Sequence, residues 1–154
     1  MDYTFQEMTQ EQAQDIAENW RYEGDYSFYD MDADPEDLAE FLDPEKRGDN
    51  YFMVFQGNEA VGFYSFGQTD EETVDIGLGM KPDLTGRGQG TAFLKAGLQF
   101  AKSNYHPQKI TLSVAAFNKR AIKLYEKLGF KEVESFVQAT NGGYFDFVKM
   151  ELDC

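Results

Sequence analysis

The stretch Leu84-Thr85-Gly86-Arg87-Gly88-Gln89-Gly90-Thr91 lies between a predicted strand and a predicted helix. The first amides of a helix have no partner within it, and the helix dipole adds partial positive charge at this end. Glycines let the backbone approach an anion closely, and Arg87 places a cation beside them. This pattern predicts a cradle for a phosphate group. The structural alternative is an ordinary glycine-rich loop, because short glycine motifs are common.

Two well-known phosphate-binding motifs do not fit this stretch. A P-loop requires Gly-Lys followed by Ser or Thr, and the stretch contains no lysine. A dinucleotide-binding fingerprint requires glycine where this chain has Thr91, within a parallel βαβ unit. The cradle is therefore expected to serve a different phosphate-bearing ligand.

The elements around the cradle follow the order of a mixed α/β protein with a largely antiparallel sheet. Apolar alternation and helical spacing distinguish the predicted strands from the predicted helices. Strands are predicted at residues 3–8, 51–55, 60–66, 73–80, 109–115, 131–140 and 144–152. Helices are predicted at residues 10–20, 35–42, 93–104 and 118–128, with irregular structure at 21–34 and 43–50. Residues 1–154 contain no repeat or linker and are predicted to form one domain.

The strand before the cradle contains Gly77 and Gly79, although glycine weakens a strand. Two glycines in one strand indicate a bulge or a close approach by another group. That group is either a ligand or a side chain that packs closely against the strand.

The acidic charge of the chain is concentrated in its first third. The formal net charge is -14 at pH 7, which argues against nucleic acid as a partner because a polyanion binds basic surfaces. Residues 1–50 carry sixteen acidic and three basic side chains, whereas residues 51–154 carry twelve acidic and eleven basic ones. This charge either attracts a cationic ligand or simply keeps the surface soluble.

The composition also argues against a membrane or metal protein. No apolar run approaches the roughly 18 residues needed to span a bilayer, and residues 1–10 do not resemble a signal peptide. We therefore expect a cytoplasmic protein with no membrane partner. The single cysteine, Cys154, cannot form an internal disulfide or a multi-cysteine metal cage, and no metal is expected.

A second motif follows the cradle, in the segment Val114-Ala-Ala-Phe-Asn-Lys-Arg-Ala-Ile-Lys-Leu-Tyr-Glu-Lys-Leu-Gly-Phe130. Asn118 is suited to cap the predicted helix, and Gly129 is suited to end it. Tyr125 lies about two turns after Asn118, so both residues fall on one face of the helix. As structure alone, Asn118 is a cap and Tyr125 belongs to an apolar stripe.

Together the two motifs resemble the signatures of the GNAT N-acetyltransferase superfamily over residues 73–131. The cradle matches Gln/Arg-x-x-Gly-x-Gly/Ala except at Thr85, and the second motif matches the strand, Asn and helix with Tyr before Gly-Phe. Residues 1–50 show no usable resemblance. The family resemblance implies a mixed sheet of about seven strands, splayed at its central strand and flanked by about four helices.

The resemblance also implies how acetyl-CoA binds. The backbone from Thr85 to Thr91 would hold the pyrophosphate, and Asn118 would bond to the pantetheine arm. The pantetheine amides would pair with the strand backbone around Leu78 to Met80. An N–H near Met80 would polarise the thioester carbonyl. Tyr125 would donate a proton or a hydrogen bond to the thiolate that leaves.

A base is needed because an amine acceptor is protonated at neutral pH. Asp75 stands where many members of the family carry a strand glutamate, so it is the candidate base, acting directly or through water. Glu71 and Glu72 precede the strand and fit a solvated loop better. His106 precedes Pro107 in a predicted loop and is interpreted as a surface residue.

The implied function is transfer of the acetyl group of acetyl-CoA to a primary amine in a ternary complex. The chain lacks a nucleophilic Cys with a partner His, so a covalent acyl-enzyme is not expected. The family's opening helices line the acceptor site, so their acidic residues favour a cationic small molecule or peptide. The alternatives are a noncatalytic acyl-CoA-binding or sensing domain and an interaction module with an acidic face. A homodimer is possible.

Overall fold

The computed structural model describes residues 3–22, 24–30, 33–84 and 88–154. The strands are β1 (Tyr3–Glu7), β2 (Tyr51–Gln56), β3 (Glu59–Gln68), β4 (Thr73–Met80), β5 (Lys109–Ala115), β6 (Lys131–Thr140) and β7 (Gly143–Asp153). The helices are α1 (Gln10–Asn19), α2 (Pro35–Leu42), α3 (Pro44–Arg47), α4 (Gly90–Tyr105) and α5 (Lys119–Lys127). Short 3-10 turns occur at η1 (Gly24–Tyr29) and η3 (Pro82–Leu84). None of the helices in these ranges is long and apolar enough to cross a membrane.

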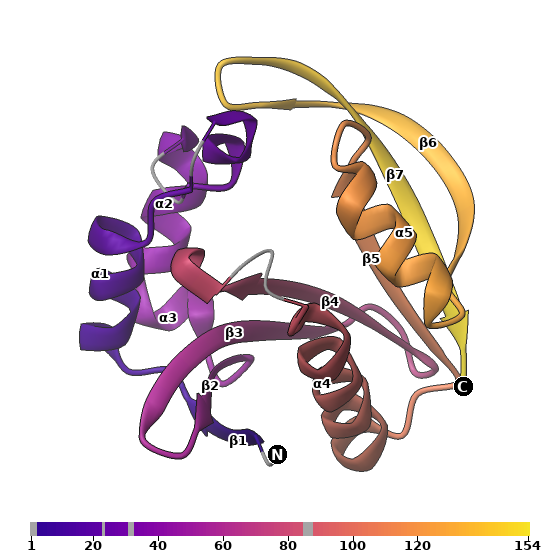
Figure 1. Cartoon of the computed structure of the whole chain (residues 1–154), viewed down its shortest axis with the longest axis horizontal. Helices are drawn as coiled ribbons and strands as arrows, with labels where there is room; N and C mark the ends of the chain where they lie inside the picture. The colour runs from indigo at the N-terminus through magenta and orange to yellow at the C-terminus, as the bar shows by residue number, and fades with distance from the viewer. Residues whose placement is uncertain (1–2, 23, 31–32, 85–87) are drawn as a thin grey trace.

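The strands form one seven-stranded sheet in the order β1-β2-β3-β4-β5-β7-β6. Every neighbouring pair is antiparallel except β4 and β5, which are parallel. These two pair only where residues 73–75 face residues 109–111, and beyond Asp75 they diverge. The sheet therefore opens into two arms, one carrying β1 to β4 and the other β5 to β7 (Figure 1). The mixed, largely antiparallel and splayed sheet predicted from the sequence is confirmed.

Two apolar clusters pack the helices on the sheet, and the larger one includes residues of both arms. The larger one packs α4 and α5 against the sheet, with Tyr64, Phe66 and Phe93 almost fully buried. The smaller one packs α1 and α2 against the opposite face and includes Trp20 and Phe63. Burial of this apolar area is the main force that holds the helices on the sheet.

Two segments predicted to be irregular contain short helical turns. Residues 43–50 include α3, because Pro44 suits a first helical turn and the Asp43 carboxylate accepts from Glu45 N–H at 3.0 Å. Arg47 in this helix is only 4% exposed, and its guanidinium bonds to the Phe41 carbonyl and to Gln10. These bonds cross distant parts of the chain, so local sequence patterns do not reveal them.

The two glycines of β4 are explained by packing from β3. A Cβ at Gly77 would lie 2.6 Å from Ser65 Oγ, and one at Gly79 would lie 2.6 Å from a ring carbon of Phe63. Real Cβ atoms do not approach other atoms so closely, so any other residue would have to displace the Ser65 side chain at position 77 or the Phe63 ring at position 79. Of the two explanations that the sequence left open, close side-chain packing is therefore the one that the fold displays.

The turn between β6 and β7 connects the two arms at the end opposite the β4–β5 pair. Asp34 Oδ2 accepts from Thr140 Oγ1 and from Asn141 N–H, both at 3.0 Å. The Asn141 amide in turn donates to the Phe28 carbonyl at 3.0 Å. We call these four residues, Phe28, Asp34, Thr140 and Asn141, the clasp. The hairpin reaches across the gap to the helical N-terminal segment (Figure 1).

Candidate active site

A cavity of about 1070 Å³ lies where β4 and β5 diverge. Its walls come from α1, η1, β4, β5 and α5. The lining comprises Asp15, Asn19, Trp20, Arg21, Tyr22, Tyr26, Tyr29, Ile76, Gly77, Leu78, Gly79, Met80, Lys81, Pro82, Leu112, Ser113, Val114, Asn118, Arg120 and Tyr125. The cavity thus brings together Leu78, Met80, Asn118 and Tyr125, which the sequence predicted to be site residues.

The register of β4 determines which of its backbone groups face the cavity. Lys81 N–H donates to the Val61 carbonyl at 2.9 Å, and Met80 lies opposite Gly62. In an antiparallel ladder, pairs that bond to each other alternate with pairs whose groups point outward. Leu78 and Met80 therefore direct their N–H and carbonyl groups away from β3, toward the side where β5 has diverged. The predicted pantetheine contact requires this orientation.

One of these backbone groups already has a partner. The Tyr22 hydroxyl donates to the Met80 carbonyl oxygen at 2.7 Å. Met80 therefore offers a ligand its N–H and not its carbonyl, whereas both Leu78 groups face the cavity side. Burial of Tyr22 and the nearby Asp30 carboxylate raise the pKa of the Tyr22 phenol, so it keeps its proton.

Only part of the predicted phosphate cradle lies within the described residues, since Thr85, Gly86 and Arg87 fall outside them. Gly88 has φ +77°, a left-handed conformation that favours glycine. The helix begins at Gly90 after Gln89, whose side chain makes no capping bond, and its first turn contains no acidic residue. The amides at the start of α4, including Thr91 N–H, therefore retain the polarity that attracts an anion.

The start of α4 also lies close to the second motif. A Cβ at Gly90 would be 3.1 Å from a methyl carbon of Leu124 on α5. The cradle and the helix that carries Tyr125 are thus adjacent, although 35 positions separate Gly90 from Tyr125 in the sequence.

Asn118 caps α5 as predicted and has a second partner across the cavity. Its Oδ1 accepts from Ala121 N–H at 3.2 Å, and its Nδ2 donates to the Tyr29 hydroxyl at 3.1 Å. Both ends of the amide are therefore fixed, which orients the remaining Nδ2 hydrogen. Burial raises the pKa of Tyr29, although bonds from Asn118 and the Ala115 backbone oppose this shift.

Tyr125 lines the cavity while its side chain is only 8% exposed. Its ring packs against Phe130, with centroids 5.9 Å apart. Burial raises the pKa of the Tyr125 phenol, and the neighbouring Tyr29 raises it further. The hydroxyl is therefore protonated at neutral pH and available as a proton or hydrogen-bond donor. Tyr125 can therefore pack in the core and also act as the predicted proton or hydrogen-bond donor.

Asp75 lies at the point of divergence and not in the described cavity lining. Its Oδ1 accepts from Thr111 Oγ1 at 2.7 Å, and Thr111 is only 3% exposed. The structure therefore does not bring Asp75 to the cavity wall with the other predicted site residues. Its assignment as the base stays a prediction.

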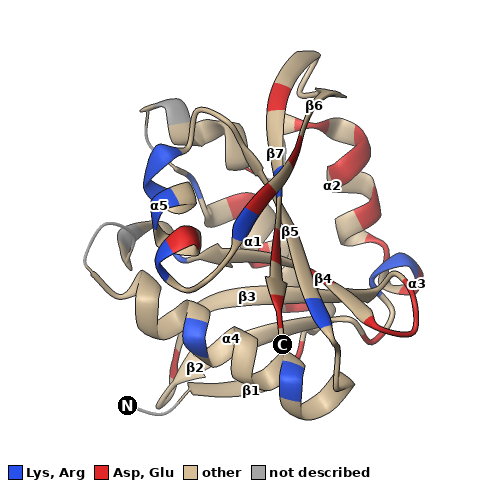
Figure 2. Cartoon of the chain, turned by 90° about the vertical axis from the view of Figure 1, so that its right-hand side faces the viewer, with Lys and Arg blue, Asp and Glu red and all other residues tan. Residues whose placement is uncertain are grey.

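The charge on the cavity wall differs from that of the whole N-terminal segment. Among the described lining residues, Asp15 is the acidic one, whereas Arg21, Lys81 and Arg120 are basic. Acidic residues gather on α2 and basic residues on α5 (Figure 2). Arg120 lies over the Tyr26 ring, 4.5 Å from its centroid. Most of the acidic residues therefore lie outside the described cavity wall.

From the sequence, Tyr22 and Tyr29 could stack on an acceptor or pack the helices together, but their hydrogen-bond partners were not predicted. Both belong to the aromatic-rich segment 21–34, which local patterns characterise only as irregular. Their partners, Met80 and Asn118, are 58 and 89 positions away. The aromatic composition was a signal that the segment covers an apolar or ligand-binding surface, but it contained no indication of these pairings.

The sequence matches the Acetyltransferase (GNAT) family over residues 7–130. The chain belongs to the GNAT acetyltransferase family. The match begins in β1, so it includes much of the acidic N-terminal segment in which the two motifs alone showed no resemblance. The prediction that family likeness starts near residue 73 was therefore too narrow, because the N-terminal elements lack short signature motifs.

Curated relatives share parts of this sequence. The mycothiol acetyltransferase of Corynebacterium glutamicum is 35% identical over 100 residues, which cover 64% of this chain and 34% of that protein. An N-alpha-acetyltransferase of Sulfurisphaera tokodaii is 47% identical over 47 residues, covering 30% of this chain and 28% of that protein. The matched region is thus about a third or less of the length of these relatives.

Solved structures share the whole fold. The spermidine N-acetyltransferase of Vibrio cholerae, solved with CoA and spermine, has a TM-score of 0.73 at 19% identity, covering 98% of this chain and 95% of that one. A GNAT-family acetyltransferase of Bacillus anthracis has a TM-score of 0.74 at 18% identity, covering 98% and 94%. At this identity, the likeness concerns the fold.

Proposed function

We propose that the chain transfers the acetyl group of acetyl-CoA to a primary amine by direct transfer in a ternary complex. The observation that carries this proposal is the exposed backbone edge of β4 at Leu78 and Met80. This edge faces the same cavity as Asn118 and Tyr125. A strand edge of this kind can pair with the amides of a pantetheine arm, and family membership supports that ligand.

The proposed chemistry uses each wall of the cavity. The amine nitrogen attacks the thioester carbonyl carbon, and the developing oxygen charge is stabilised by Met80 N–H. As the new C–N bond forms, the C–S bond breaks and the CoA thiolate takes a proton from Tyr125. The resulting phenolate takes, through water, the proton that the nitrogen loses on becoming an amide. The start of α4 holds the pyrophosphate, including the amides of Gly88 to Thr91. Asn118 binds the pantetheine chain of CoA through its remaining Nδ2 hydrogen.

The amine must lose a proton before or during this attack. Asp75 is the proposed base, on the ground that family members carry an acidic residue at this strand position. Because the Asp75 carboxylate bonds to Thr111 outside the described lining, we propose that it acts through ordered water.

We propose that the acceptor is a cationic amine, either a small molecule or a basic peptide. The acidic side chains of residues 1–50, with Asp15 in the cavity wall, would concentrate such an amine. The basic residues Arg21, Lys81 and Arg120 suit the phosphates of CoA or an anionic part of the acceptor. The Vibrio cholerae enzyme with bound spermine has the same fold. A homodimer stays a prediction, which light scattering in solution would check.

Calorimetry with acetyl-CoA and a free-thiol assay against a panel of polyamines, simple amines and peptides would test the proposal. Binding of acetyl-CoA together with amine-dependent thiol release is expected. Binding without release on any amine would favour a noncatalytic acyl-CoA-binding or sensing domain. Absence of binding would instead favour an interaction module.

A further inference from the structure

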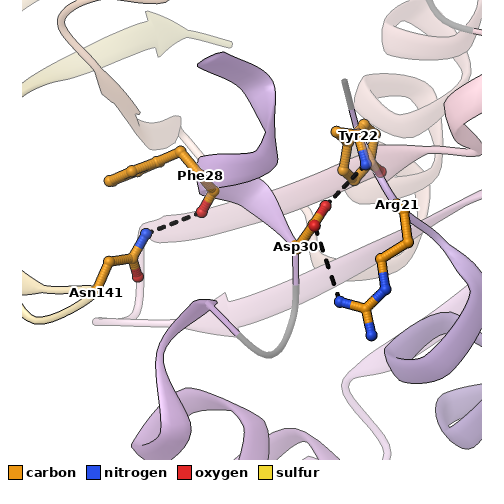
Figure 3. Close-up of polar contacts among 5 residues, drawn as sticks. All are labelled: Arg21, Tyr22, Phe28, Asp30 and Asn141. Atoms are coloured by element: carbon orange, nitrogen blue, oxygen red, sulfur yellow. Dashed lines mark hydrogen bonds and ion pairs between the residues drawn. The ribbon is translucent and has the colours of Figure 1, made fainter. Parts of the chain in front are cut away.

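Tyr22, between α1 and η1, is held by two hydrogen bonds. Its hydroxyl donates to the Met80 carbonyl at 2.7 Å, and its backbone N–H donates to Asp30 Oδ1 at 2.8 Å. The other Asp30 oxygen lies 3.8 Å from the Arg21 guanidinium. Figure 3 shows Asp30 between Tyr22 and Arg21, with Phe28 bound to Asn141 of the clasp nearby in the chain. The Asp30 side chain is only 14% exposed, so its charge is poorly screened.

The peptide group between Met80 and Lys81 is held by a hydrogen bond at its carbonyl and another at its N–H. Its carbonyl accepts from Tyr22, and its N–H donates to the Val61 carbonyl at 2.9 Å on β3. In an extended strand, the N–H and carbonyl of one residue point to the same side. Fixing the Met80 carbonyl toward the cavity therefore also fixes the direction of Met80 N–H.

The Tyr22 hydroxyl has an electrostatic consequence as well. A carbonyl without a partner beside the thioester would present negative charge to an oxygen that becomes more negative during the reaction. A donated hydrogen bond reduces that charge, and preorganised dipoles in a partly desolvated site have a large effect on a reaction.

We propose that Tyr22 is a positioning residue for acetyl transfer, holding the end of β4 so that Met80 N–H stays directed at the thioester carbonyl. This inference rests on the proposed function. Tyr22 acts through Met80 and does not exchange a proton with either substrate.

Tyr22→Phe removes the hydroxyl and keeps the ring, and Tyr51→Phe is the matched control. Tyr51 is a half-buried tyrosine of β2 whose hydroxyl bonds to Ser65, outside the described cavity lining. We expect Tyr22→Phe to lower kcat roughly 10-fold or more with little change in the KM of acetyl-CoA. Tyr51→Phe should leave both constants close to those of the unmodified chain.

A binding measurement tests the same idea without turnover. If Met80 N–H contacts the acetyl oxygen, the unmodified chain should bind acetyl-CoA more tightly than CoA. In Tyr22→Phe the ratio of the two Kd values should move toward one, while the affinity for CoA stays the same. If the role of Tyr22 were merely structural, Tyr22→Phe would weaken the binding of acetyl-CoA and of CoA to the same extent.

Several results would overturn the inference. One is a Tyr22→Phe variant in which both kcat and the ratio of the two Kd values are unchanged. Another is a loss of affinity for CoA equal to the loss for acetyl-CoA. A third is an effect confined to the KM of the amine. If Tyr22→Phe does not fold, Asp30→Asn replaces it, since loss of this anchor charge should lower kcat in the same direction. Failure of the unmodified chain to turn over any amine would contradict the proposed function, whereas the Kd ratio would still decide the role of Tyr22.

Discussion

At the residue scale, Tyr125 combines burial with a place in the cavity wall. Its pKa lies above the ordinary value of 10.0, so the proton available to the thiolate is present throughout the neutral range. Tyr125→Phe should lower kcat by about 100-fold, the size expected for loss of a general acid. Acetyl-CoA affinity, measured by calorimetry, should change little because the ring remains.

The raised pKa of Tyr125 also predicts how kcat depends on pH. An acid loses activity as pH rises through its pKa, so Tyr125 should produce no falling limb of kcat below about pH 10. Tyr105→Phe, on α4 and outside the described cavity lining, serves as a control for loss of a phenol. A Tyr125→Phe variant with the rate of the control would reduce Tyr125 to a packing residue.

A further prediction at the residue scale concerns Asp75 as the proposed base. Asp75→Asn preserves an oxygen that can accept from Thr111, so the fold should be retained. If the carboxylate takes the proton of the amine through water, kcat should fall about 100-fold. Glu71→Gln, in the exposed turn before β4, is the control. A kcat for Asp75→Asn equal to that of Glu71→Gln would exclude Asp75 as the base.

At the element scale, the clasp connects the helical N-terminal segment to the β6–β7 hairpin. The Asp34 carboxylate accepts bonds from Thr140 and Asn141 while it also caps α2 through Glu36 and Asp37 N–H. The Asn141 backbone bond is the largest cause that lowers the Asp34 pKa below its ordinary value of 3.8. The folded state thus binds this proton less tightly than the unfolded chain does.

Asp34→Asn should therefore destabilise the chain in a pH-dependent way. For a carboxyl with a lowered folded-state pKa, the stabilisation is complete above pH 3.8 and is lost as pH falls through the folded-state pKa. The difference in unfolding free energy between the two chains should be largest near pH 7 and shrink below pH 3.8, as measured by denaturant titration. Asp43→Asn, which caps α3 alone, should have a smaller effect. A difference that is constant with pH would contradict the role of the charge.

At the scale of the whole molecule, the two arms diverge beyond the short parallel pair, and the cavity lies between them. The clasp joins the β6–β7 hairpin to the helical N-terminal segment. The acidic charge of residues 1–50 predicts that kcat/KM for a polyamine falls as salt rises, because salt screens charges beyond about 10 Å at 0.1 M. A neutral amine analogue provides the comparison, and its kcat/KM should change little as the salt concentration rises. Equal salt dependence for both acceptors would remove the charge argument.

Much of the fold followed from local patterns. Thr9 caps α1 with a full capping box, Asn118 caps α5, and the strands of both hairpins lie where the apolar runs predicted them. The helix α3 and the turn η1 were missed because segments so short have little periodicity. The number of helices was therefore underestimated, with five α-helices in the described residues where about four were expected.

The sequence by itself determined the order of the elements, the glycine turn before α4 and the pairing of Asn118 with Tyr125 on one helix face. Each depends on residues within a few turns of one another, for which backbone geometry is sufficient. Only the tertiary structure decided that Tyr22 binds Met80, that Tyr29 binds Asn118, and that Asp75 lies outside the described cavity wall. These contacts join distant positions, and they depend on how the two arms diverge and how the helices pack against them.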